Sequence, residues 1–535
     1  MKKTKTIAFA LIVLLAAAIL LAACGSPEPE DETAYITISL GGGASRAAVP
    51  WNTDIDDEAI PHDIKIGNTI VATGLYITND EKAVLTRSVS AGTHKVEVRG
   101  YDPSDKTKLI SYAEETVTVT ARQTTTCEMK MSQAFETSTT PWNDAIAAIK
   151  AGGGNDRACY IFVNKDDTGT GIPANSAANT FSNSTIVDII RVFISGDHTI
   201  TLSGTGSLLK IYAGQTVTLR GAHLKGNSGN DTPLVLIDGG TFTMENGTIS
   251  DNIAGGSSGG GGRVNSGFFN MSCGTISGNK LTNNVAGGGV NVTGGKFTMT
   301  GGTISDNTAG SGGGVYVHTP ATFDMSGGAI SDNTAIGNYG MGGGVDSDGT
   351  FTMSGTALIT KNEATSMGGG VSSRGTFTMS GTALITKNEA TNQGGGVFGG
   401  GNFRMEGGTI SVNNAIAGGG VFVNSGTFTM TGGTISTNTA TNTGTGGGVF
   451  IYTGAVFDMS GTAGISGNTS DYAGGGVYLG GASGGSQTFN LEKLELVHNN
   501  TATNKGNQVH VSEDGTFKVG GSTFGDYDAI NFTKN

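Results

Sequence analysis

The stretch GTISDNTAGSGGGVYV at Gly302–Val317, preceded by KFTMTG at Lys296–Gly301, recurs with variations from about residue 240 to residue 520. The Phe of its F-x-M element marks each recurrence, at spacings of 25 to 32 residues. These marker residues are Phe242, Phe269, Phe297, Phe323, Phe351, Phe377, Phe403, Phe428, Phe457, Phe489 and Phe517. A repeat of this length predicts a stacked repeat architecture.

Each unit contains three short strand-like pieces separated by turn residues: F-x-M, T-I-S-x-N and G-G-G-V-x-V. Alternation points Phe297 and Met299 to one face, as it does Val315 and Val317. One coil cannot bury this apolar face alone, so equal residues should stack coil on coil. The sequence therefore predicts an all-β chain whose main part is a long parallel β-helix, with about fifteen coils over residues 160–525.

An Asn follows the inward Ile of each unit after three residues. Asn tolerates the left-handed conformation at a turn, and stacked side-chain amides can hydrogen-bond along the axis. We interpret this column as a structural ladder, because no acid or histidine accompanies it to make a ligand-binding column. Its expected members are Asn252, Asn279, Asn307, Asn333, Asn362, Asn388, Asn413, Asn438, Asn468 and Asn499.

The repeat also resembles a known family. Ile304-x-x-Asn307, followed by Gly313-Gly314-Val315, is similar to the F-x-x-N and G-G-A-[ILV] motifs of polymorphic outer membrane protein repeats, with Ile in place of Phe and Gly in place of Ala. The resemblance covers roughly residues 240–510. It implies a right-handed, pectin-lyase-like β-helix and a role in adhesion at a bacterial surface.

The chain begins with a predicted secretory signal over residues 1–23, in which basic residues precede a short apolar segment. The sequence Leu21-Ala22-Ala23-Cys24-Gly25 resembles a lipoprotein processing site. This implies lipidation of Cys24 and anchoring at the bacterial outer membrane or cell surface. Residues 24–33 are expected to form an acidic tether.

A different periodicity covers residues 34–132, where short alternating runs predict a small antiparallel β-sandwich. Its expected strands are 34–40, 82–89, 94–101, 108–115, 116–121 and 125–131. SAGTHKVEVRGYD at 90–102 resembles immunoglobulin-like or transthyretin-like modules. Residues 133–158 are expected to be a linker and a capping helix that starts near Pro141, and residues 159–535 the β-helix with irregular first coils.

Composition excludes several functions. The formal charge is −13, and −16 once Lys2, Lys3 and Lys5 leave with the signal, which argues against a nucleic-acid partner. The remaining cysteines, Cys127, Cys159 and Cys273, have no spacing typical of a disulfide framework or a metal site. We expect no metal and no cofactor.

The repeats offer little catalytic chemistry. Asp306 and Asp332 occupy equal positions on neighbouring coils and form a weak acidic candidate pair, with solvated turn carboxylates as the alternative. Asp348 is expected to be a turn residue of little consequence. No motif of β-helix polysaccharide lyases or hydrolases is present.

These observations predict a monomeric, lipid-anchored surface protein that binds host, matrix or glycan ligands in the manner of an adhesin. A display rod without a defined ligand is the alternative, and a carbohydrate-active enzyme is the third hypothesis. We expect the protein not to be an enzyme.

Overall fold

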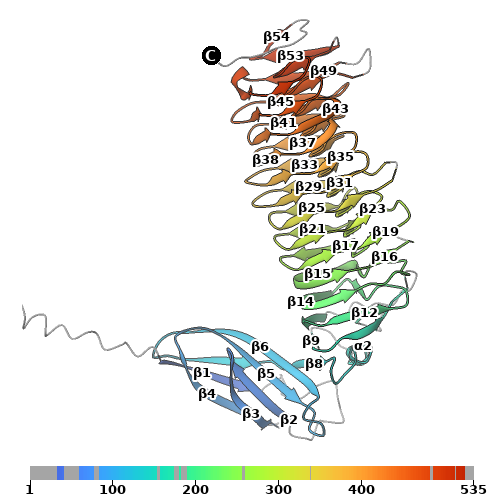
Figure 1. The fold of residues 1–535 in the computed structure, drawn as a ribbon. Helices are drawn as coiled ribbons and strands as arrows, with labels where there is room; N and C mark the ends of the chain where they lie inside the picture. The colour runs from blue at the N-terminus through green and yellow to red at the C-terminus, as the bar shows by residue number, and fades with distance from the viewer. Residues whose placement is uncertain are drawn as a thin grey trace, which may run out of the picture. The chain divides into compact units, whose positions relative to one another are not determined.

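The computed structural model describes residues 33–40, 60–77, 83–152, 157–173, 180–181, 190–255, 259–337, 339–481, 486–512 and 514–524 (Figure 1). The signal, Cys24 and the rest of the expected tether up to residue 32 lie outside these residues, whereas Thr33, expected in the tether, begins the first strand. The chain divides into two compact units, Met1–Ser132 and Gln133–Asn535.

The first unit is a small β domain of two sheets. In one sheet, β1 (Thr33–Leu40) pairs antiparallel with β4 (Ala83–Ser90) and parallel with β7 (Thr124–Met129). The other sheet contains β2 (Ile60–Ile66), β3 (Thr69–Ile77), β5 (Gly92–Tyr101) and β6 (Leu109–Val119), all antiparallel. Apolar side chains of both sheets, among them Ile36, Val98 and Met129, share one core.

Two details of this unit differ from the expectation. Residues 108–115 and 116–121 are not two strands: Leu109–Val119 is one strand, since no turn residue interrupts it. Strands β2 and β3 were not expected from the sequence, because the alternation at Ile64–Ile66 is short and Pro61 precedes it. The prediction of a small antiparallel β domain is confirmed in part, since β1 and β7 pair parallel.

The second unit is a parallel β-helix of about 13 turns (Figure 1). The expectation of fifteen turns was too high, because a coil uses 25 to 32 residues. The irregular first coils comprise β9 (Arg157–Val163), β10 (Asp167–Thr170), β11 (Ile190–Gly196), β12 (Thr199–Ser203), β13 (Leu209–Tyr212), β14 (Gln215–Lys225), β15 (Val235–Ser250), β16 (Ile253–Ala254), β17 (Gly262–Met271), β18 (Thr275–Ser277) and β19 (Lys280–Leu281).

The regular coils build four parallel ladders. The F-x-M ladder contains β21 (Lys296–Met299), β25 (Thr322–Met325), β29 (Thr350–Met353), β33 (Thr376–Met379), β37 (Asn402–Met405), β41 (Thr427–Met430), β45 (Val456–Met459), β49 (Gln487–Leu491) and β53 (Gly515–Val519). The T-I-S ladder contains β22 (Thr303–Ser305), β26 (Ala329–Ser331), β30 (Leu358–Thr360), β34 (Leu384–Thr386), β38 (Thr409–Ser411), β42 (Thr434–Ser436), β46 (Gly464–Ser466) and, after the 3₁₀ turn η2 (Leu494–Leu496), β50 (Val497–His498).

The third ladder is the V-x-V ladder, formed by β20 (Val290–Val292), β24 (Val315–Val317), β28 (Val345–Ser347), β32 (Val371–Ser373), β36 (Val397–Gly399), β40 (Val421–Val423), β44 (Val449–Ile451), β48 (Val477–Leu479) and β52 (Val509–Val511). The fourth was not expected, because two-residue strands have no readable alternation. It continues from β16 and β19 through β23 (Thr308–Ala309), β27 (Thr334–Ala335), β31 (Glu363–Ala364), β35 (Glu389–Ala390), β39 (Asn414–Ala417), β43 (Thr439–Thr445), β47 (Thr469–Ser470) and β51 (Thr501–Ala502).

The core is a stack of identical side chains in register. Successive marker phenylalanines from Phe242 to Phe517 lie with ring centroids 4.5–5.2 Å apart. Phe297 pairs with Phe323, and Phe323 with Phe351, as expected. Truncating one buried Phe in such a stack typically costs about 3–5 kcal/mol.

Both ends of the β-helix are covered. Helix α2 (Trp142–Ala151) buries Trp142, Ala145 and Ile149 at the first coil, as a cap should. Residues 133–136 are not linker, because they lie in β8 (Ser132–Glu136), which pairs with β9. At the other end, β54 (Ser522–Phe524) turns back antiparallel on β53.

Candidate functional site

The Asn column is an internal hydrogen-bonded ladder. Each fully buried Asn from Asn279 to Asn438 donates its side-chain amide to the side-chain oxygen of the next, at 2.9–3.0 Å. The same amides bond to backbone carbonyls, for example Asn333 to Ile304 at 2.9 Å. Because these groups satisfy one another inside the coil, the column has no face left for a ligand.

The last member of the ladder is Asn500, not Asn499. Asn468 donates to Asn500 at 2.9 Å, whereas Asn499 is exposed. The inward residue of this coil is Val497, which pairs with Ile465, so the Asn three residues later is Asn500. The sequence reasoning also missed both ends of the ladder: Asn230 donates to Asn252, and Gln508 accepts from Asn500.

The acidic pair Asp306 and Asp332 lies in a strained turn. Both residues are exposed and have φ of +57°. Their column also holds Lys361, Thr437 and, at φ +59°, Val412. A β-branched residue is disfavoured in this left-handed conformation. A column that accepts acids, bases and Val412 alike is set by the backbone turn, and it gives Asp306 and Asp332 no shared chemistry.

The cysteines have no common site. Cys127 and Cys159 are buried, and burial raises the pKa of each thiol to about 11. Cys273 is exposed and unpaired. None of the three is placed as a reactive thiol.

A cluster of charged side chains lies instead in the outward column of the V-x-V ladder. Strand alternation turns Val345 inward and Asp346 outward. In the ladder register, Tyr316, Asp346 and Ser372 occupy this outward position on three successive coils. Two residues further along the same coils lie His318, Asp348 and Arg374. We call these six residues the polar cluster.

Arg374 holds the cluster together. Its Nε lies 2.6 Å from Asp348 Oδ1, and its Nη2 lies 3.2 Å from Asp346 Oδ2. Tyr316 Oη donates to Asp348 Oδ2 at 2.6 Å, and the Tyr316 and His318 rings lie 4.4 Å apart. The expectation that Asp348 is an unimportant turn residue is therefore wrong.

The two carboxylates differ in burial, and their pKa values are shifted in opposite directions. Asp346 is fully buried, and burial raises its pKa to about 6 although the Arg374 guanidinium opposes the shift. Asp348 keeps about a third of its side-chain surface exposed. Although burial acts to raise the pKa of Asp348 too, hydrogen bonds from Arg374 and Tyr316 outweigh it and lower that pKa. Burial also lowers the pKa of His318.

Several buried polar atoms in and beside the cluster have no hydrogen-bond partner among the described residues. They are Asn291 Oδ1, Arg263 Nε and His318 Nε2, whereas the neighbouring Ser372 hydroxyl and Asp346 carboxylate interact with each other. A buried polar atom left without a partner costs about 1–3 kcal/mol. Three of them on three successive coils distinguish this face from the fully satisfied Asn ladder.

The same outward column changes character after the cluster. From Phe398 onward it holds Phe398, Phe422, Phe450, Tyr478 and His510, whose neighbouring rings lie 4.7–5.7 Å apart. The three phenylalanines are buried against Met367, Ala417 and Tyr452. Because the rings face one another, this aromatic segment packs mainly with itself.

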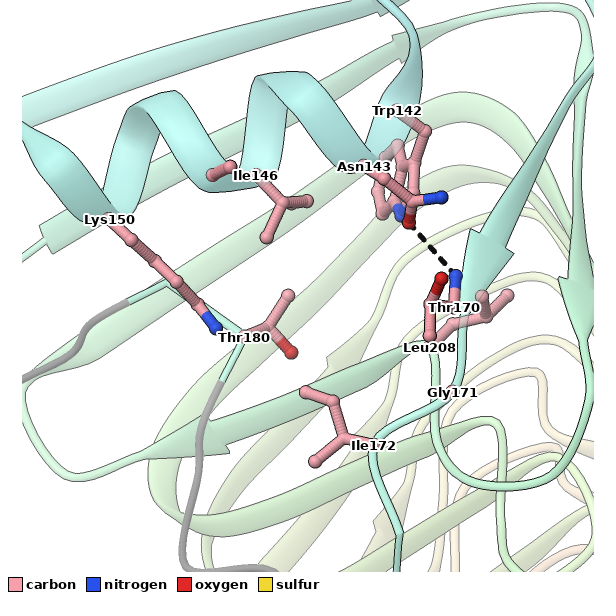
Figure 2. Close-up of a pocket in the computed structure, with 10 residues that line it drawn as sticks. Trp142, Asn143, Ile146, Lys150, Thr170, Gly171, Ile172, Thr180 and Leu208 are labelled. Atoms are coloured by element: carbon pink, nitrogen blue, oxygen red, sulfur yellow. Dashed lines mark hydrogen bonds between the residues drawn. The ribbon is translucent and has the colours of Figure 1, made fainter.

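A cavity of about 280 Å³ lies under the capping helix (Figure 2). Its walls include Trp142, Ile146, Ile172 and Leu208, and Asn143 Oδ1 accepts from the backbone N–H of Thr170 at 2.9 Å. Lys150 is the charged residue among those that line it, and burial lowers the pKa of its ammonium. The side chains of Asn143 and Thr180, which also line the cavity, already bond to backbone groups, so the cavity defines no chemistry.

No group of three or more His, Cys, Asp or Glu residues in the described parts of the chain is placed to hold a metal ion. Among the same residues, no helix has both the length and the apolar character needed to cross a bilayer. Comparisons with protein-family models, curated proteins and solved structures each found no match. The polar cluster has therefore to be interpreted from its own chemistry.

Proposed function

We propose that this chain is a lipid-anchored bacterial surface protein that binds its ligand through the polar cluster of its β-helix. In this proposal the β-helix is pectin-lyase-like and related to polymorphic outer membrane protein repeats. The N-terminal domain is an immunoglobulin-like or transthyretin-like spacer. The protein acts as a monomer at the outer membrane or cell surface and has no nucleic-acid partner.

One observation carries the proposal. In the polar cluster, Asp346 of the outward column and Asp348, two residues further along, both pair with Arg374 of the next coil, whereas later coils carry buried phenylalanines in that column. Buried polar groups without partners are rare in proteins and mark positions where another molecule can supply the missing hydrogen bonds. The processing-site sequence around Cys24 supports display at a surface.

The test uses cells that display the whole chain. Wild-type cells should adhere saturably to immobilised matrix proteins or glycans, and Arg374→Gln should weaken adherence at least tenfold. Lys361→Ser, an exposed change on a coil of the same region, is the matched control. Adherence that does not saturate, or that is equal in all three, would favour a display rod instead.

The anchor is tested separately. Cys24→Ser should abolish incorporation of labelled fatty acid and release the protein from the membrane fraction. Membrane association that persists in this variant would show that a different anchor exists.

A carbohydrate-active enzyme is the second candidate, and a specific observation favours it. Asp346, with a pKa of about 6, lies in a cluster that also contains Asp348, Tyr316 and His318. A carboxyl group that is partly protonated near neutral pH can act as a general acid. Release of new sugar chain ends by wild-type protein, lost in Asp346→Asn, would establish this activity in place of simple binding.

A further inference from the structure

An internal duplication points to the polar cluster as the specialised part of the β-helix. Residues 341–365 and 367–391 are identical except at two positions. Asp346 in the first copy corresponds to Ser372 in the second, and Asp348 corresponds to Arg374. Exposed residues of the first copy, such as Thr350 and Lys361, are unchanged in the second.

The two differences are structurally linked. Arg374 of the second copy contacts both aspartates of the first copy, at 3.2 Å and 2.6 Å. Had the copies diverged without function, changes would be expected first at exposed positions, where packing imposes least. Here they occur only where the two coils together build a charged, hydrogen-bonding surface.

The charges of the polar cluster limit the classes of ligand that it can bind. Asp346 and Asp348 neutralise Arg374, so an anionic group such as a sulfate or uronate would meet Asp348 as well as the guanidinium. A cation would find too few oxygen ligands, since no metal-holding group occurs among the described residues. The buried atoms left without partners include an acceptor, Asn291 Oδ1, a donor, Arg263 Nε, and a group that can take either role, His318 Nε2. A hydroxyl group can both donate to and accept from such a set.

We propose that the polar cluster binds a neutral, hydroxyl-rich ligand, that is, an uncharged sugar chain. The sugar chain runs along successive coils, and the partly exposed side chains of Asp348, Arg374 and His318 make the contacts. Asp346 is a positioning residue, because it lies beneath Arg374 and holds the guanidinium. This inference rests on the proposed binding function and specifies its ligand.

The purified full-length protein is tested in detergent by calorimetry against hexasaccharides: neutral glucan, mannan and galactan, together with oligogalacturonate and a heparin fragment. At least one neutral hexasaccharide should bind wild-type protein, and the acidic ones should bind at least tenfold more weakly. The double variant Asp346→Ser with Asp348→Arg makes both copies identical and removes the two carboxylates that pair with Arg374. It should lose neutral-sugar affinity at least tenfold, while Lys361→Ser keeps it.

A second variant distinguishes a loss of binding from misfolding of the double variant. Asp348→Asn preserves shape and should also weaken neutral-sugar binding at least tenfold, with an unchanged circular dichroism spectrum. Tighter binding of oligogalacturonate or heparin, equal binding by all variants, or no binding of any neutral hexasaccharide would overturn the inference. Saturable adherence of wild-type cells combined with any of these results would leave the proposed surface function intact, so the two failures are distinguishable.

Discussion

Two segments on the outward face of the V-x-V ladder have the same backbone conformation but different kinds of side chain. The segment from Tyr316 to Arg374 is charged and contains buried polar atoms without partners, whereas the segment from Phe398 to His510 is aromatic and packs with itself. Beneath both, the same Phe stack and the same Asn ladder continue without a break. The contrast teaches that the interior fixes the coil and leaves the outward column free to vary.

The difference also separates stability from recognition. Phe398, Phe422 and Phe450 bury apolar surface on the outside of the coil, which adds to the stability that the core provides. The polar cluster instead buries charge, which is costly unless every group is paired. We therefore expect changes in the aromatic segment to affect unfolding alone, and changes in the polar cluster to affect both unfolding and binding.

The largest expected effect is in the aromatic segment. Phe422 is 1% exposed and lies between Phe398 and Phe450. Phe422→Ala should lower the free energy of unfolding by about 3–5 kcal/mol, measured by urea denaturation, without altering ligand affinity. A loss of binding in this variant at a temperature where it stays folded would break the comparison.

The next effect is in the polar cluster. Arg374→Gln leaves Asp346 buried without its charge partner and should cost about 3 kcal/mol as well as binding. Arg404, which pairs with Glu406 at an exposed position, is the matched control. Arg404→Gln should cost about 0–1 kcal/mol. Equal costs for the two variants would show that the Asp346–Arg374 pair is not held in a buried site.

The smallest effect concerns pH. The pKa of Asp346 is about 6 in the folded protein, above its ordinary value of 3.8, so the folded state holds this proton more tightly. The resulting stability is fully present below about pH 4 and is lost as the pH rises through 6. Its total is roughly 3 kcal/mol at most.

The control variant is Asp346→Asn. Its free energy of unfolding should not show the decrease that wild-type protein shows as the pH rises through 6. Thermal unfolding of wild-type and variant protein between pH 4 and pH 7 measures this pH dependence. The difference between the two plots of stability against pH gives the contribution of Asp346. Parallel curves would mean that Asp346 ionises as an exposed carboxylate does.

Much of the fold was readable because it repeats. Alternation at Phe297–Met299 and the recurring Ile304 and Asn307 predicted a parallel β-helix, and the structure places those residues in continuous stacks. The fourth ladder was missed because Thr308–Ala309 is too short to alternate. Asn499 was the wrong choice, because the inward residue of its coil is Val497 and the Asn three residues later is Asn500.

The candidate site was less readable, for a physical reason. Asp306 and Asp332 drew attention as equal acids one coil apart, yet their column is a left-handed turn that admits any side chain. Asp346, Asp348 and Arg374 share no motif along the chain. The spacing of 26 residues between Asp348 and Arg374, equal to the shift between the duplicated copies, was the one signal that could have joined them.

The sequence by itself determined which residues stack, because each coil buries only a fixed set of small and apolar side chains and must repeat it. Tertiary structure alone decided which outward residues meet. Asp346, Asp348 and Arg374 come together because stacking places consecutive coils one strand spacing apart. At that spacing the Arg374 guanidinium pairs with both carboxylates, and burial within the stack raises the pKa of Asp346.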